Sequence, residues 1–111
     1  MEFEEREVDG KLVLTLVGKR LDAAAAPVFK HKMVDLINQG QTRIALNMGN
    51  VDFMDSTGLA SLLSSLKSMG DKGKIVLFSL NKRIKQLFTI TRLDKGVLQI
   101  FDTEEDSLGA L

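Results

Sequence analysis

The residue types best suited to chemistry in this chain lie where an apolar stretch gives way to a run of leucines. Asp55, Ser56, Thr57 and Gly58 stand at that boundary, where a predicted strand is followed by a predicted helix. A hydroxyl at the beginning of a helix lies near free backbone N–H groups and the positive end of the helix dipole, where phosphate is readily accepted. The same residues also suit ordinary helix capping by Asp55 or Ser56, with Gly58 permitting close packing. The residues alone therefore leave two interpretations open: a phosphate-accepting serine and a structural cap.

Other residues with catalytic potential are few. The single histidine, His31, stands between Lys30 and Lys32 in a segment with helical spacing, and no neighbour in sequence could complete a triad with it. The nine glycines are scattered and form no phosphate-binding loop of the Walker or dinucleotide type. Three consecutive acids, Glu104 to Asp106, spread around a helix and suit its first turn better than a metal site. We therefore expect a protein that is not an enzyme and has no metal and no cofactor.

The composition argues against partners that are recognised by charge. The 111 residues include fifteen basic and fifteen acidic side chains, so no net field gathers nucleic acid or an anionic membrane surface. The chain has no cysteine, no segment typical of a secretion signal, and no apolar run near the roughly 20 residues that cross a bilayer. We expect a single domain over residues 1–111, located in the cytoplasm, without membrane insertion and without direct contact with nucleic acid.

The elements that position the serine follow from the apolar pattern. Two strand-like stretches, Phe3 to Val8 and Lys11 to Val17, flank Asp9-Gly10, a dipeptide typical of tight hairpins. Helical spacing follows, with Asp22 as a candidate N-cap and Pro27 tolerated in the first turn. The chain is therefore expected to begin with an antiparallel pair and a helix.

The rest of the chain alternates between short apolar runs and helical patterns. The further predicted strands are Arg43 to Met48, Lys74 to Leu80 and Val97 to Phe101. A second helix is expected from near Thr57 to Gly70, a third after the N-cap Asn81, and a fourth from a cap at Asp102 to near Leu111. The second helix carries one apolar stripe, made of Leu59, Leu62, Leu63, Leu66 and Met69. Strands alternating with helices predict an α/β fold with a mainly parallel central sheet, an N-terminal antiparallel strand and about four helices.

Residues 50–63, "NVDFMDSTGLASLL", resemble the phosphorylation-site segment of bacterial anti-sigma factor antagonists, the small single-domain members of the STAS family. The resemblance is close from Met54 to Leu59. It extends to Gly18–Val28 ("GKRLDAAAAPV") before the first helix and to Leu87–Leu93 ("LFTITRL") at the end of the third. Two positions depart from the family pattern: Arg20 stands where an acid is frequent, and Arg92 stands where glycine is common.

The resemblance implies a role for each residue of the central motif. Ser56 would be phosphorylated by a serine kinase that is also an anti-sigma factor, and Asp55 would be the acid beside it. Asp22 would be a loop acid near the site that helps to engage the kinase. Thr57 and Gly58 match a Ser/Thr position and a small-residue position of the family, and both are assigned to partner binding.

The mechanism implied by the resemblance is a partner switch. The unphosphorylated protein would sequester the kinase and free a sigma factor, phosphorylation of Ser56 would block binding, and a PP2C-type phosphatase would restore the first state. Two alternatives stay open: a STAS scaffold or transport-complex subunit without phosphate cycling, and a domain that binds a nucleotide or other small ligand. The sequence does not indicate the oligomeric state, the kinase or the sigma factor.

Overall fold

Two sheets of unequal size organise the chain in the computed structural model, which describes residues 1–111. The larger sheet has the strand order β1-β2-β4-β6-β7, with β1 and β2 antiparallel and the other neighbours parallel. The smaller sheet pairs β3 and β5 in parallel. The strands are β1 (Glu2–Val8), β2 (Lys11–Val17), β3 (Arg20–Leu21), β4 (Arg43–Asn47), β5 (Phe53–Met54), β6 (Lys74–Phe78) and β7 (Ile100–Phe101).

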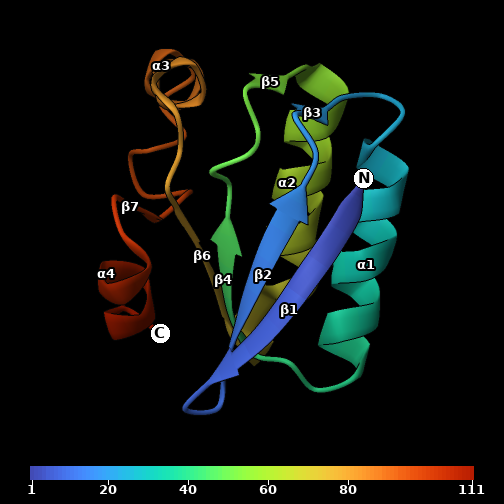
Figure 1. The fold of residues 1–111 in the computed structure, drawn as a ribbon, viewed down its shortest axis with the longest axis vertical. Coiled ribbons are helices and arrows are strands. Elements are labelled where there is room, and N and C mark those ends of the chain that lie inside the picture. The colour runs from blue at the N-terminus through green and yellow to red at the C-terminus, as the bar shows by residue number, and fades with distance from the viewer.

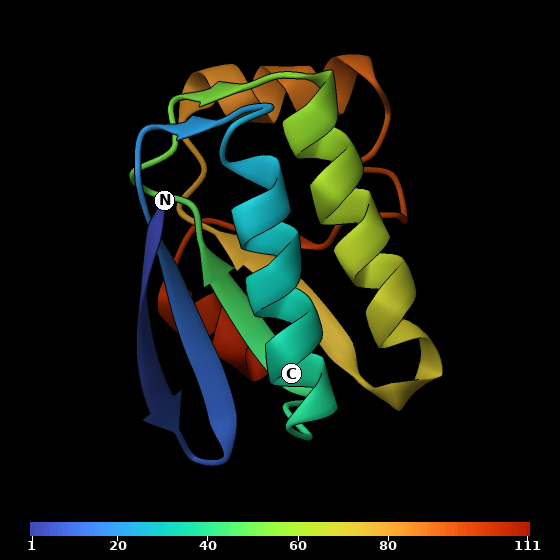
Figure 2. The same cartoon turned by 90° about the vertical axis from the view of Figure 1, so that its right-hand side faces the viewer.

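The helices cover both faces of the larger sheet, as Figures 1 and 2 show. The α-helices are α1 (Ala26–Asn38), α2 (Ser56–Met69), α3 (Lys82–Ile90) and α4 (Glu104–Gly109), and a 3-10 turn, η1 (Gly70–Lys72), follows α2. Helices α1 and α2 lie side by side on one face, and α4 lies on the other. Helix α3 lies with β3 and β5 beyond the carboxyl ends of the central strands. The predicted α/β class, mainly parallel sheet and four helices are confirmed.

The core lies mainly between the sheet and the paired helices. Strands β2, β4 and β6 are buried on both faces, which explains why their sequences are almost continuously apolar. The larger core cluster joins these strands to α1, α2 and α3, and a smaller one lies under α4. Burial of both faces holds the central strand ends, and the loops after them, in one arrangement.

Several predicted turns and caps are confirmed. Asp9 and Gly10 have φ angles of 52° and 77°, as a tight hairpin requires of its two central residues. Pro27 lies in the first turn of α1. Asn81 caps α3, because its side-chain oxygen accepts a hydrogen bond of 2.9 Å from the backbone N–H of Ile84.

Other local predictions are wrong. Asp22 does not cap α1: the N-cap residue is Ala25, which makes no side-chain capping bond, because a separate turn intervenes after Asp22. Thr103, not Asp102, caps α4 and accepts a hydrogen bond of 3.1 Å from the N–H of Asp106. The last strand contains only Ile100–Phe101, and Val97 is exposed in the loop before it. Local pattern identified these elements but not the residues at which they begin.

The buried face of α2 also differs from the predicted stripe. Leu62 and Met69 are buried, but Leu59, Leu63 and Leu66 are only half-buried. Two serines, Ser61 and Ser65, lie on the buried face instead, and their hydroxyls donate to the carbonyls of Gly58 and Ser61 at 2.6 and 2.8 Å. A serine that bonds to its own helix needs no other partner, so small polar residues fit this close contact.

Candidate functional site

The beginning of α2 places Ser56 at the surface. Asp55 is the N-cap residue in an extended conformation, and its Oδ1 accepts a hydrogen bond of 2.8 Å from the N–H of Gly58. Ser56 is the first helical residue; it and Thr57 are exposed. The Ser56 hydroxyl makes no hydrogen bond to the protein, so Asp55, not Ser56, has the capping role.

The second acidic loop follows β3. One carboxylate oxygen of Asp22 accepts bonds from the backbone N–H groups of Ala24 and Ala25, at 3.2 and 3.1 Å. The other accepts from Nε of Arg20 at 3.1 Å. These contacts, first the bond from Ala25 and then that from Arg20, hold the pKa of Asp22 below its usual range. Asp22 is therefore a charged residue whose orientation is set by its own turn.

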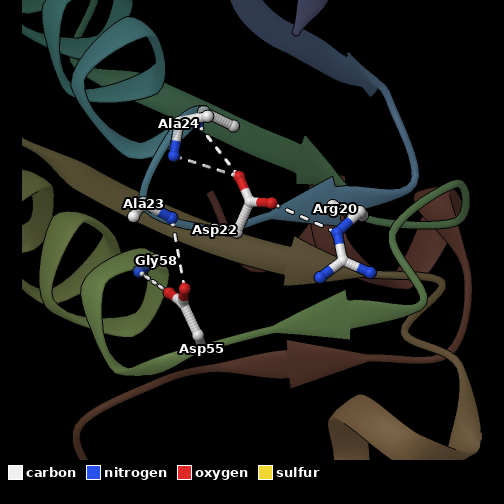
Figure 3. Close-up of polar contacts among 7 residues, drawn as sticks. Arg20, Asp22, Ala23, Ala24, Asp55 and Gly58 are labelled. Atoms are coloured by element: carbon white, nitrogen blue, oxygen red, sulfur yellow. Dashed lines mark hydrogen bonds and ion pairs between the residues drawn. The ribbon is translucent and has the colours of Figure 1, made fainter.

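Three tertiary contacts join the two loops, as Figure 3 shows in part. The second carboxylate oxygen of Asp55 accepts a bond of 3.2 Å from the N–H of Ala23, thirty-two residues earlier in the chain. Strands β3 and β5, which lead into the loops, pair directly. At Gly58, an added Cβ would lie 1.9 Å from the carbonyl oxygen of Leu21, so only glycine permits this approach. The Asp22 loop and the Ser56 helix start form one rigid surface.

This surface brings together all five residues predicted from the sequence, Asp22, Asp55, Ser56, Thr57 and Gly58. Free backbone N–H groups at the beginning of α2 and its dipole make the position of Ser56 favourable for an anionic group. No His, Lys or Cys side chain takes part in the hydrogen bonds that hold the two acids. The arrangement suits a docking surface that accepts a modification, and it contains no catalytic triad.

The structure adds one side chain to this surface, that of Arg20, which the sequence marked only as a departure from a family pattern. The guanidinium carbon of Arg20 lies 4.1 Å from the centre of the Phe53 ring, while its Nε bonds to Asp22. The register of β3 and β5 pairs Arg20 with Phe53. No local sequence signal predicts this contact, since the two residues are far apart in the chain.

Other candidate groups lie outside this surface. His31 is exposed on α1 and faces Asp35 at 3.3 Å, and Glu104 pairs with Arg6 of β1. No group of three or more potential metal ligands is present. The larger cavity, of about 320 Å³, lies between α3 and β7, and neither cavity is lined by any of the five predicted site residues. None of the helices combines the length and apolar character that a membrane span requires.

Arg92, the other departure noted in the sequence, has a φ angle of 59°. This is the left-handed region, which glycine adopts without steric cost and arginine does not. A glycine would adopt this φ angle without steric cost, whereas Arg92 holds it at some energetic cost.

The fold and the exposed helix start define a small α/β domain, and comparison with known families agrees. The STAS domain model matches residues 2–107, which is nearly the whole chain, and the chain belongs to the STAS domain family. The anti-sigma-B factor antagonist of Staphylococcus epidermidis is 33% identical over 78 residues, covering 69% of this chain and 72% of that protein.

Two solved structures extend the likeness to the whole fold. The crystal structure of TM1081 from Thermotoga maritima is 28% identical, with a TM-score of 0.85 over 97% of this chain and 92% of that chain. The anti-sigma factor antagonist SpoIIAA in its unphosphorylated form is 26% identical, with a TM-score of 0.71 over 98% of this chain and 96% of that chain. The family expected from the central motif is therefore confirmed.

Proposed function

We propose that this protein is an anti-sigma factor antagonist that exchanges partners through phosphorylation of Ser56. The observation that carries the proposal is the exposed Ser56 hydroxyl, which makes no hydrogen bond to the protein although the adjacent Asp55 caps the helix. The serine is thus free for modification without loss of the cap. Relatives named as anti-sigma factor antagonists, of similar length, support the assignment of residues 1–111 to one regulatory domain.

In the unmodified state, the surface around Ser56 docks against a serine kinase that is also the anti-sigma factor. Asp22 contributes a fixed charge, Thr57 contributes an exposed hydroxyl, and Gly58 holds the helix start against β3. Because the hydrogen bond from Ala23 to Asp55 ties the two loops together, little ordering is needed on binding. The kinase is sequestered, and the sigma factor it would otherwise hold is released.

Phosphorylation reverses this docking by charge. A phosphoserine adds about −1.5 to −2 charges, which lie beside Asp55 and near Asp22 and must be desolvated in any interface. In the free protein the helix start accepts the phosphate, so the folded state is not lost. A coupling of about 1–3 kcal/mol, or roughly 5- to 150-fold in affinity, is enough to redistribute partners.

No large shape change is required for this switch. SpoIIAA is known in a phosphorylated form as well as an unphosphorylated one, and this chain resembles the two with TM-scores of 0.72 and 0.71. A PP2C-type phosphatase removes the phosphate and restores the binding form. The protein is accordingly a substrate of two enzymes in the cytoplasm and catalyses no reaction itself.

The test compares the affinities of three variants for the anti-sigma kinase encoded in the same genome, measured by calorimetry. Ser56→Ala is expected to bind as tightly as the unmodified protein and to resist phosphorylation. Ser56→Asp is expected to bind at least about 5-fold more weakly. Thr57→Ala is the matched control for the phosphoacceptor, since it removes the neighbouring exposed hydroxyl: it should still be phosphorylated, at Ser56.

Mass spectrometry of the protein from its own cells gives the second readout. Occupancy of Ser56 by phosphate should change with growth condition. Equal kinase affinity for Ser56→Ala and Ser56→Asp, together with an unmodified Ser56 in every condition, would exclude the switch and favour a STAS subunit that binds a neighbour without phosphate cycling.

A further inference from the structure

Arg20 lies at the edge of the surface formed by the Asp22 loop and the start of α2, and two contacts hold its guanidinium in place. Its Nε donates to Asp22, its guanidinium lies over the Phe53 ring at 4.1 Å, and its side chain is 60% exposed. The two terminal nitrogens make no hydrogen bond and no ion pair within the protein. Figure 3 shows them turned away from the Asp22 carboxylate. Arg20 therefore presents an unused pair of donors to solvent.

This geometry prepares the guanidinium for an external anion. Contact with Phe53 and the bond to Asp22 restrict the side chain, so less rotamer entropy is lost when an anion binds. The terminal N–H groups form a planar fork, which matches a carboxylate in bidentate geometry. An exposed arginine without these two restraints would bind the same anion more weakly.

We propose that Arg20 is the specificity residue of this surface and receives an acidic side chain of the partner kinase. The inference rests on the proposed function and adds the chemistry of the partner. The chain has equal numbers of acidic and basic residues, so its overall field does not select a partner, and a fixed local charge can. A kinase with a basic side chain at the facing position would be rejected by like charge.

As the anion that binds the free donors of Arg20, a carboxylate of the partner fits better than the phosphate on Ser56. In Figure 3 the guanidinium lies on the far side of Asp22 from the Asp55 carboxylate, which caps the helix that begins at Ser56. The free donors belong to a side chain that is 60% exposed, so a docking protein can reach them.

The test measures kinase affinity by calorimetry in the Ser56→Ala background, which keeps the protein unphosphorylated. Arg20→Gln is expected to weaken binding by about 10-fold or more, and Arg20→Glu by about 100-fold or more. Lys19→Gln is the matched control: it removes one positive charge from the adjacent exposed residue, which has no ion pair, and should change affinity by less than about 3-fold. Replacing the facing acid of the kinase with arginine should restore binding of Arg20→Glu.

Three results would overturn the inference. If Arg20→Gln and Lys19→Gln have equally small effects while Ser56→Asp still loses binding, the switch stands and the assigned role of Arg20 falls. If Arg20→Gln leaves kinase affinity unchanged but raises the pKa of the phosphate on phosphorylated Ser56, followed by phosphorus NMR, the arginine serves the phosphate instead. If Ser56→Ala and Ser56→Asp bind the kinase with equal affinity, the proposed function is rejected, and this inference falls with it.

Discussion

Replacement of Gly58 by alanine tests whether the helix start is held against β3. Alanine normally stabilises a helix by up to about 1 kcal/mol relative to glycine. Here the new Cβ would lie 1.9 Å from the carbonyl oxygen of Leu21 and 2.7 Å from its carbonyl carbon. The helix start would have to withdraw by about 1.5 Å to reach the 3.4 Å at which ordinary van der Waals contact begins.

The clash involves backbone on both sides, so no flexible side chain can relieve it. Movement of this size also stretches the bond between Asp55 and Ala23 and disturbs the pairing of β3 with β5. We expect Gly58→Ala to lower the free energy of unfolding by about 3 kcal/mol, in the upper range of overpacking effects. For a chain of this length that corresponds to a fall in Tm of about 12 °C.

Thermal unfolding followed by circular dichroism measures the effect, with urea unfolding as a second determination of the free energy. Gly109→Ala in α4 is the matched control, since it makes the same substitution at a helical glycine with nothing within 4 Å of the added Cβ. It should leave the Tm unchanged or raise it slightly. A Tm for Gly58→Ala that matches the control would refute the close approach and the rigid surface built on it.

Three further substitutions have defined outcomes. Asp55→Ala removes the cap of α2 and the hydrogen bond to Ala23, so it should lower the free energy of unfolding, measured in urea, by about 1–2 kcal/mol. An unchanged urea midpoint would show that these two hydrogen bonds of Asp55 do not stabilise the fold. Asp22 has a folded-state pKa below its usual value of about 3.8, so its stabilising contribution is present above the usual pKa and is lost as pH falls through the folded-state pKa. The Tm difference between the natural protein and Asp22→Asn should therefore shrink between about pH 6 and about pH 2.5, and a constant difference would argue against the lowered pKa. Arg92→Gly relieves a left-handed backbone with φ of 59° and should raise stability by about 0.5–1 kcal/mol, whereas a fall in Tm would show that the arginine side chain is needed.

Much of the fold was predictable because its signals are local. The hairpin at Asp9-Gly10 depends on two residues that accept positive φ, and the cap of α3 depends on Asn81 and an N–H three residues later. The predictions failed where neighbouring residues could serve the same structural role, or where a residue's propensity did not match its place in the fold. Asp102 and Thr103 are both capable caps, and the chain uses Thr103; Val97 has strand propensity but lies outside the sheet.

The candidate site was predictable as a set of residues and unpredictable as a surface. The serine, its flanking acid and the glycine adjoin in sequence, so their place at a helix start follows from the switch between strand and helical periodicity. The sequence could not distinguish whether Asp55 or Ser56 caps the helix. The structure assigns the cap to Asp55, and this leaves the Ser56 hydroxyl free.

The sequence by itself determined the four helices and the five strands of the larger sheet, in their order, since spacing and turn chemistry act within a few residues; the short strands β3 and β5 were not predicted. Only the tertiary structure decided that Asp55 bonds to Ala23, that Arg20 lies over Phe53, and that Gly58 touches β3. Each of these contacts joins residues more than thirty positions apart, and their register is set by the pairing of β3 with β5 beyond the carboxyl ends of the central strands. Long-range register comes from burial of the core as a whole, and no short stretch of sequence encodes it.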